Sequence, residues 1–164
     1  MPSTLSLTMG NANMSIDDLD RRILIELQQD GRMTNQELSE RVGLSPSPCL
    51  RRLKILEAEV IKGYVALVDP ATVGLGVTGF IRVRLDRQSD HHLAEFEQAV
   101  ARFPEVMECY LMTGDADYQL RVVVSDLAAF EDFLRQKLTK IGGVAQLTTS
   151  FALRPVIYKT GLPI

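Results

Sequence analysis

The sequence has 164 residues, enough for one domain or two small ones. Eighteen basic and 21 acidic residues give a net charge of −3, which excludes a polycation that coats nucleic acid but allows a local basic patch. No apolar run is long enough for a membrane span, no secretory signal opens the chain, and the two cysteines are too few for a disulfide scaffold or zinc finger. These features predict a reduced, cytoplasmic protein with no membrane partner.

Residues 1–14 are polar and aperiodic, which predicts a flexible tail. Residues 15–63 have the pattern of three short helices. Asp17 or Asp18 is placed to cap the first helix, which Gly31 ends. Its apolar stripe consists of Leu19, Ile23, Leu24 and Leu27.

The second and third helices have the spacing of a helix-turn-helix. The segment Thr34-Asn-Gln-Glu37 is a capping-box pattern for the second helix, and Gly43 suits a left-handed end. The segment Ser45-Pro46-Ser47-Pro48 opens the third helix, because proline is tolerated in a first turn. This order predicts a DNA-binding domain whose third helix, starting near Ser47, enters the major groove of double-stranded DNA.

The start of the third helix is locally basic. Residues 45–54 carry three positive charges and no acid, and they include two serine hydroxyls suited to phosphates or base edges. A solvated basic face on a packed helical subdomain is the plainer interpretation, but the turn, the prolines and the acid-free run together favour DNA binding. The predicted DNA-binding residues are Thr34, Asn35, Ser45, Pro46, Ser47, Pro48, Arg51, Arg52 and Lys54.

The hydrophobic pattern changes after Gly63. Residues 64–76 are predicted to form a linker, with a strand over residues 64–69 that Pro70 stops. Residues 77–164 then alternate in the order β-α-β-β-α-β, which predicts a ferredoxin-like domain and makes the whole chain α+β. Strands are expected over 80–85, 106–112, 118–124 and 144–153, and helices over 90–103 and 127–141. Two helices would cover one face of the sheet, so the other face favours a dimer.

A turn at Thr113-Gly-Asp-Ala-Asp117 connects two of these strands. Gly114 allows a ligand to approach the backbone, and Asp115 and Asp117 offer acceptors for an ammonium group. A plain hairpin turn is the simpler interpretation of this segment. An Asp-x-Asp metal site of an enzyme is a further alternative, although the sequence has no glycine-rich phosphate loop.

Several strings together resemble the Lrp/AsnC family of feast/famine transcriptional regulators. They are Asp20-Arg-Arg-Ile-Leu24, Gln28-Gln-Asp-Gly-Arg32, Arg41-Val-Gly-Leu-Ser45, Leu44-Ser-Pro-Ser-Pro-Cys49 and Thr113-Gly-Asp-Ala-Asp-Tyr118. The resemblance covers about residues 16–164. It implies a winged helix-turn-helix followed by a ferredoxin-like domain, in a regulator of amino-acid metabolism that binds DNA and a small amino-acid effector.

The resemblance also implies an assembly and a ligand site. Family members dimerise through their sheets, the dimers form octamers or larger discs, and amino acids bind between dimers near the Gly-Asp-x-Asp-Tyr turn. Residue-by-residue matching gives the candidate cleft as Leu111, Thr113, Gly114, Asp115, Asp117, Tyr118, Ser150, Phe151 and Ala152. No catalytic residue, cofactor or metal is predicted. The alternatives are an architectural DNA-binding protein with little sequence preference, a metal-dependent enzyme using Asp115 and Asp117, and a sensor without DNA binding.

Overall fold

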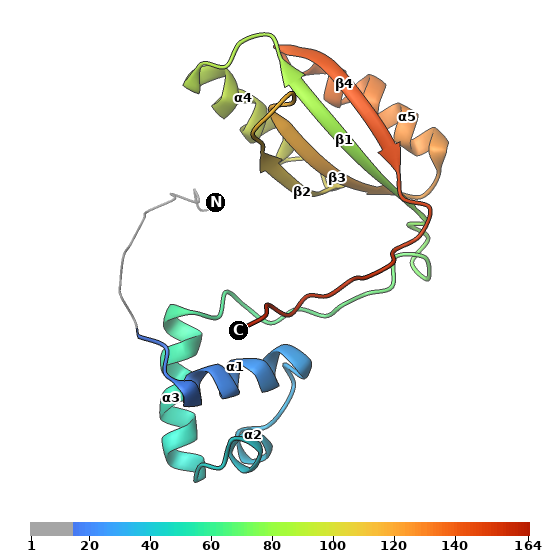
Figure 1. The fold of residues 1–164 in the computed structure, drawn as a ribbon. Coiled ribbons are helices and arrows are strands. Elements are labelled where there is room, and N and C mark those ends of the chain that lie inside the picture. Colours follow the sequence, from blue (N-terminus) through green and yellow to red (C-terminus); the bar gives the residue numbers. More distant parts are fainter. Residues whose placement is uncertain (1–14) are drawn as a thin grey trace. The chain divides into compact units, whose positions relative to one another are not determined.

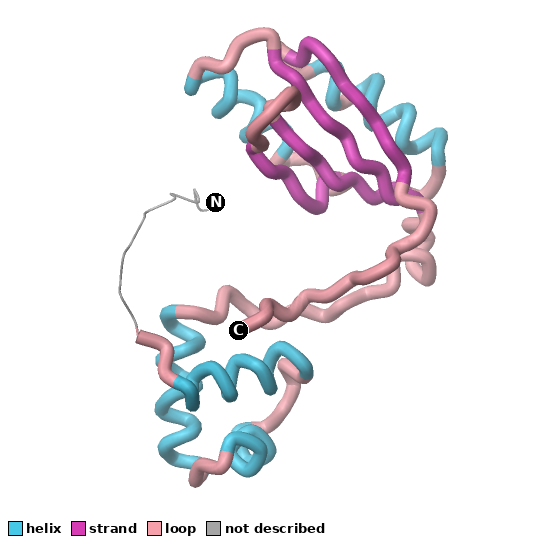
Figure 2. Tube along the Cα trace, viewed as in Figure 1, coloured by secondary structure: helices cyan, strands magenta, loops and turns pink. Residues whose placement is uncertain are grey.

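The computed structural model describes residues 15–164, and the tail predicted over residues 1–14 lies outside them. The chain divides into two compact units. The helical unit consists of the chain up to Ala66 together with the C-terminal segment Tyr158–Ile164. The sheet unit spans Leu67–Ile157. Figure 1 shows the elements of each unit, and Figure 2 distinguishes helix from strand. Within residues 15–164 no helix is long and apolar enough to cross a membrane.

The helical unit contains the three predicted helices, α1 (Asp18–Gln29), α2 (Asn35–Val42) and α3 (Pro46–Glu59). Their apolar faces meet in a small core, in which Ile23, Leu24, Leu27, Leu38, Val42, Cys49 and Leu56 are buried. Each of the two predicted local signals at α2 is present: Thr34 and Glu37 form the capping box, and Gly43 ends the helix with φ at 71°. Satisfied helix ends therefore fix where α2 begins and where it stops.

The last residues of the chain pack against α1. The side-chain amide of Gln28 donates to the carbonyl oxygen of Leu162 at 3.2 Å and accepts from the backbone N–H of Leu162 at 2.5 Å. Gly161 lies beside the same side chain, where an added Cβ would be 3.5 Å from Cβ of Gln28. The C-terminal segment thus belongs physically to the helical unit, a long-range pairing that no local sequence pattern announces.

The sheet unit has the predicted order of elements. They are β1 (Val77–Leu85), α4 (Asp90–Val100), β2 (Val106–Leu111), β3 (Tyr118–Val124), α5 (Leu127–Gln136), the 3₁₀ turn η1 (Leu138–Lys140) and β4 (Val144–Phe151). All strand pairings are antiparallel, in the spatial order β2-β3-β1-β4. This is the ferredoxin-like arrangement expected from the sequence, and both helices lie on one face of the sheet (Figures 1 and 2).

Strand alternation divides the sheet into a covered and an uncovered face. Ile81 and Val83 of β1 point into the core beneath the helices, together with Leu120 and Val122 of β3. The alternate residues form the uncovered face, called the open face below. On the evidence of strand register it carries Phe80, Arg82, Arg84, Glu108, Tyr110, Gln119, Arg121, Thr148 and Ser150.

The strand predicted over residues 64–69 does not form among the described residues. The segment lies outside regular secondary structure, and Val65 is 83% exposed. An apolar, β-branched run favours extended backbone, but a strand also requires a neighbour to receive its N–H and C=O groups. The helix predicted to reach residue 103 also ends earlier, at Val100, and the one predicted to reach residue 141 gives way to η1 after Gln136.

Gly79 of β1 leaves room for the ring of Phe130. A Cβ built on Gly79 would overlap Cε2 of Phe130, closer than any real contact. We therefore expect Gly79→Ala to lower the free energy of unfolding of the sheet unit by about 1–3 kcal/mol, the usual cost of overpacking a core. Urea denaturation measures this, with Gly142→Ala as control because nothing lies within 4 Å of its Cβ position. Equal stability of the two variants would show that Phe130 moves aside freely.

Candidate nucleic-acid interface and ligand site

Two of the predicted DNA-binding residues stand at the start of α2, and one of them joins α2 to α3. The side-chain amide of Asn35 donates to the carbonyl oxygen of Pro46 at 2.9 Å, which ties the start of α2 to the start of α3. Thr34 donates its hydroxyl and its backbone N–H to the carboxylate of Glu37, each at 2.8 Å. These bonds hold the pKa of Glu37 below its usual value. Thr34 therefore fixes the start of α2, and Asn35 links that start to the first turn of α3.

The first turn of α3 is exposed and free of acidic residues. Ser45, Pro46, Ser47 and Pro48 are all exposed, while Cys49 is fully buried beneath them. Proline has no N–H, so the two prolines leave fewer backbone donors here than an ordinary helix N-terminus offers. Ser45 makes no capping hydrogen bond with its side chain. The serine hydroxyls are thus the principal neutral donors of this turn.

The three cations of α3 differ in their surroundings. Arg51 and Lys54 are exposed, and within residues 15–164 no acidic side chain lies within salt-bridge distance of either. Arg52 instead points to α1, where its Nη1 lies 2.7 Å from Oδ2 of Asp17 and 2.8 Å from Oδ1 of Asp20. The prediction grouped all three as DNA contacts. In the structure Arg51 and Lys54 are exposed, whereas Arg52 is engaged with α1.

The predicted ligand turn lies between β2 and β3. Thr113, Gly114 and Asp115 are exposed, and Gly114 has a φ of 118°, a conformation that favours glycine. The carboxylate of Asp115 lies 3.5 Å from Nη1 of Arg82, with the Asp115 side chain 84% exposed. A carboxylate and a guanidinium therefore stand side by side at the surface, with little to hold them together.

Asp117 and Tyr118 face the interior instead. Asp117 accepts the backbone N–H of Leu85 at 2.7 Å and the side-chain amide of Gln88 at 2.6 Å, one on each carboxylate oxygen. The hydroxyl of Tyr118 donates a hydrogen bond to the carboxylate of Glu97 at 2.9 Å. Burial of the ring is the main cause that raises the pKa of Tyr118, and the hydrogen bond to Glu97 is the second. The expectation that Asp117 faces an ammonium group, or shares a metal with Asp115, does not fit this geometry, because both Asp117 oxygens already bind the protein.

Ser150, Phe151 and Ala152 lie at the other end of the sheet from the turn. Tyr118 pairs with Val83 of β1, whereas Ser150 pairs with Phe80 and Phe151 with Gly79. Phe151 packs its ring against Phe130, with centroids 4.7 Å apart. Leu111 is exposed beside the turn, and Ala152 follows the end of β4. One chain therefore does not bring residues 113–115 and 150–152 together.

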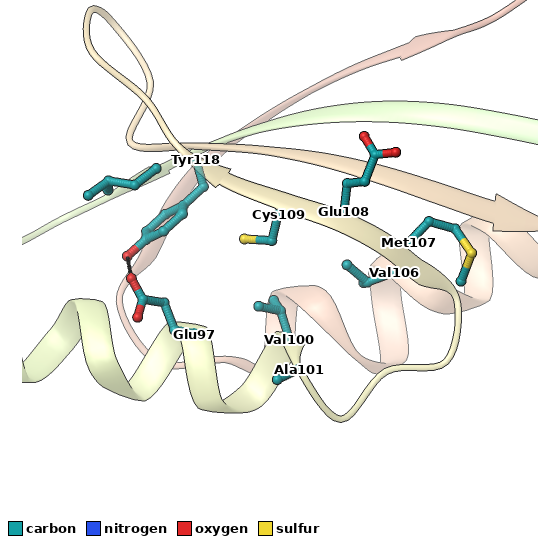
Figure 3. A pocket seen from close by; sticks show the side chains of 9 residues that line it. Glu97, Val100, Ala101, Val106, Met107, Glu108, Cys109 and Tyr118 are labelled. Atoms are coloured by element: carbon teal, nitrogen blue, oxygen red, sulfur yellow. Dashed lines mark hydrogen bonds between the residues drawn. The ribbon is translucent and has the colours of Figure 1, made fainter. Parts of the chain in front are cut away.

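A cavity of about 370 Å³ lies between α4 and the edge strand β2 (Figure 3). Only two of its lining residues, Leu111 and Tyr118, belong to the predicted site. The others are Glu97, Val100, Ala101, Val106, Met107, Glu108 and Cys109. Partial desolvation of the thiol, and after it the nearby Glu97, raise the pKa of Cys109 to about 11, which disfavours the reactive thiolate. Sequence reasoning missed this cavity because it depends on how α4 packs on β2.

The comparisons with known proteins cover both units. The model of a winged helix-turn-helix DNA-binding domain matches residues 16–59, and the model of the Lrp/AsnC ligand binding domain matches residues 78–162. The Bkd operon transcriptional regulator of Pseudomonas aeruginosa is 44% identical over 150 residues, which are 91% of this chain and 98% of that protein. The leucine-responsive regulatory protein of Rhizobium meliloti is 42% identical, covering 87% of this chain and 92% of that protein.

A solved structure shows the same arrangement of elements. The crystal structure of a Neisseria meningitidis transcriptional regulator in complex with L-Met matches with a TM-score of 0.86 and 43% identity, covering 91% of this chain and 97% of that one. A helix-turn-helix followed by a ferredoxin-like ligand-binding domain defines a DNA-binding transcriptional regulator. The chain belongs to the Lrp/AsnC family, whose curated members matched here are transcriptional regulators and not enzymes.

Proposed function

We propose that a small amino acid binds the sheet unit and changes how strongly the helical unit occupies its DNA sites. The observation that carries this proposal is the match of residues 78–162 to the Lrp/AsnC ligand binding domain, joined to a solved relative that holds L-Met. An effector acts on DNA occupancy only if it binds one assembly or conformation better than another, with a typical coupling of about 1–3 kcal/mol.

The exposed pair of Asp115 and Arg82 matches the charges of a free amino acid. Asp115 would accept the ammonium group and Arg82 would donate to the carboxylate, while Gly114 leaves the backbone N–H groups of the turn accessible. Residues 150–152 lie at the far end of the same sheet, so they join such a site only from another copy of the chain. We therefore place the effector between copies, with Asp115 rather than Asp117 accepting from its ammonium group.

Calorimetric titration of all twenty amino acids, paired with DNA-binding curves, tests this function. Asp115→Asn is expected to weaken effector binding at least tenfold through loss of a charge-assisted contact, roughly 1.4 kcal/mol. Glu131→Gln, an exposed change of the same charge on α5, is the control and should bind normally. No binding of any amino acid to the wild-type protein, or unchanged binding by Asp115→Asn, would rule out this site.

The open face of the sheet is the surface we propose for dimerisation, with further assembly to octamers. It carries two exposed aromatic residues, Phe80 and Tyr110, among polar neighbours. We expect Tyr110→Asp to shift the protein toward monomer in sedimentation at micromolar concentration, because it buries a charge in an interface core. Leu127→Asp, which alters an exposed leucine at the start of α5, should leave the assembly intact. A monomeric wild-type protein would disprove the proposed dimer.

A further inference from the structure

The N-terminus of α1 holds a preorganised acceptor for one arginine of α3. Asp17 and Asp20 form a capping box, in which the Asp20 N–H donates to Oδ1 of Asp17 at 2.8 Å and the Asp17 N–H donates to Oδ2 of Asp20 at 3.3 Å. The other oxygen of each carboxylate faces Nη1 of Arg52. One guanidinium thus completes a cluster whose acidic side is already fixed by the backbone.

The position of Arg52 along α3 explains why its side chain points toward α1. Arg52 follows Cys49 by three residues and precedes Leu56 by four, and Cys49 and Leu56 are the buried residues of the helix. Side chains at these spacings share one face. Arg51 and Lys54 fall on the opposite side of the helix and are exposed. The side chain of Arg52 is 30% exposed and that of Asp20 only 9%.

The two carboxylates of the cluster also neutralise the charge of Arg52, so Arg52 adds no net positive charge to the surface of α3. Two carboxylates face one guanidinium, so a DNA phosphate approaching it meets no net attraction. The apolar residues Cys49 and Leu56, with Leu53 partly buried beside them, pack α3 on the core without fixing its rotation by directional bonds, whereas Arg52 adds hydrogen bonds to the start of α1. We propose that Arg52 is a positioning residue, which anchors α3 to Asp17 and Asp20 so that Arg51, Lys54 and the serines meet DNA in the correct orientation.

Asp20→Asn separates this role from simple electrostatics. Removing an acidic charge from a DNA-binding unit strengthens binding if charge alone matters, whereas loss of the anchor weakens it. We expect about five- to tenfold weaker binding to a duplex selected from a random library by the wild-type protein, in line with a partly exposed ion pair. Asp18→Asn is the matched control, since Asp18 lies in the same turn outside the cluster, and it should bind equally well or slightly better.

Arg52 itself gives a second readout through salt dependence. Arg52→Ala should weaken binding without changing the slope of log affinity against log salt, whereas loss of a phosphate contact flattens that slope by about one unit. Arg52→Lys should recover part of the affinity, because an ammonium still reaches one carboxylate. Asp17→Asn leaves the Asp20 pair in place and serves if Asp20→Asn fails to fold; it should weaken binding to a lesser degree. Unchanged or tighter binding by a folded variant at Asp20 or Asp17, or a flattened slope for Arg52→Ala, would overturn the proposal.

Discussion

Asp117→Ala is expected to lower the free energy of unfolding of the sheet unit by about 2–3 kcal/mol, because it leaves a buried donor without its charged partner. Asp117 is only 8% exposed. Its carboxylate accepts hydrogen bonds from the backbone N–H of Leu85 at 2.7 Å and from the side-chain amide of Gln88 at 2.6 Å. Removing it leaves the Leu85 N–H unsatisfied at the end of β1. Urea denaturation followed by far-UV circular dichroism measures the change.

Asp115→Ala is the matched control for this stability prediction. It removes the same side chain from the same turn, but Asp115 is exposed and its ion pair with Arg82 is 3.5 Å long, so the change should stay within about 0.5 kcal/mol. Equal stability losses for the two variants would contradict the structural role of Asp117. The contrast also guides effector studies, since weak ligand binding by an Asp117 variant would reflect a damaged turn.

The local signals in the sequence predicted the elements well. The capping box of Thr34 with Glu37 and the left-handed Gly43 satisfy or terminate the ends of α2 through groups three or four residues away, so their partners could be found in the sequence itself. The strand expected over residues 80–85 likewise forms as part of β1, with Ile81 and Val83 buried. Such features depend on residues that are close together in the sequence, so they can be predicted from the sequence alone.

The roles of the site residues depended on distant partners. Asp115 and Asp117 belong to one motif, yet only Asp117 meets the N–H of Leu85, some thirty residues earlier. Arg51 and Arg52 are neighbours, yet only Arg52 meets the N-terminus of α1. The helical spacing of Cys49, Arg52 and Leu56 was visible in the sequence, and weighing it would have separated Arg52 from the exposed cations. The register of β4 against β1, which sets Ser150 apart from the turn, had no such local signal.

Arg51→Ala and Lys54→Ala are expected to weaken DNA binding, each flattening the slope of log affinity against log salt by about one unit if the lost contact is to a phosphate. Both side chains are exposed beside the acid-free first turn of α3, and neither is engaged in a salt bridge within residues 15–164. A slope near one per cation corresponds to the counterions that each positive charge releases from DNA. The double variant should therefore lose about two units of slope.

A contact from Arg51 to a base edge would give a different result from a phosphate contact, and the same DNA-binding titrations distinguish the two. If Arg51 reads a base edge, its loss should relax specificity at one position by about 1–3 kcal/mol, while affinity for unrelated duplexes changes little. Lys140→Ala, which removes one exposed positive charge from the sheet unit, controls for net charge and should leave the slope unchanged. Folded Arg51→Ala and Lys54→Ala proteins that bind the selected duplex with wild-type affinity and slope would exclude this face of α3 as the DNA-binding surface.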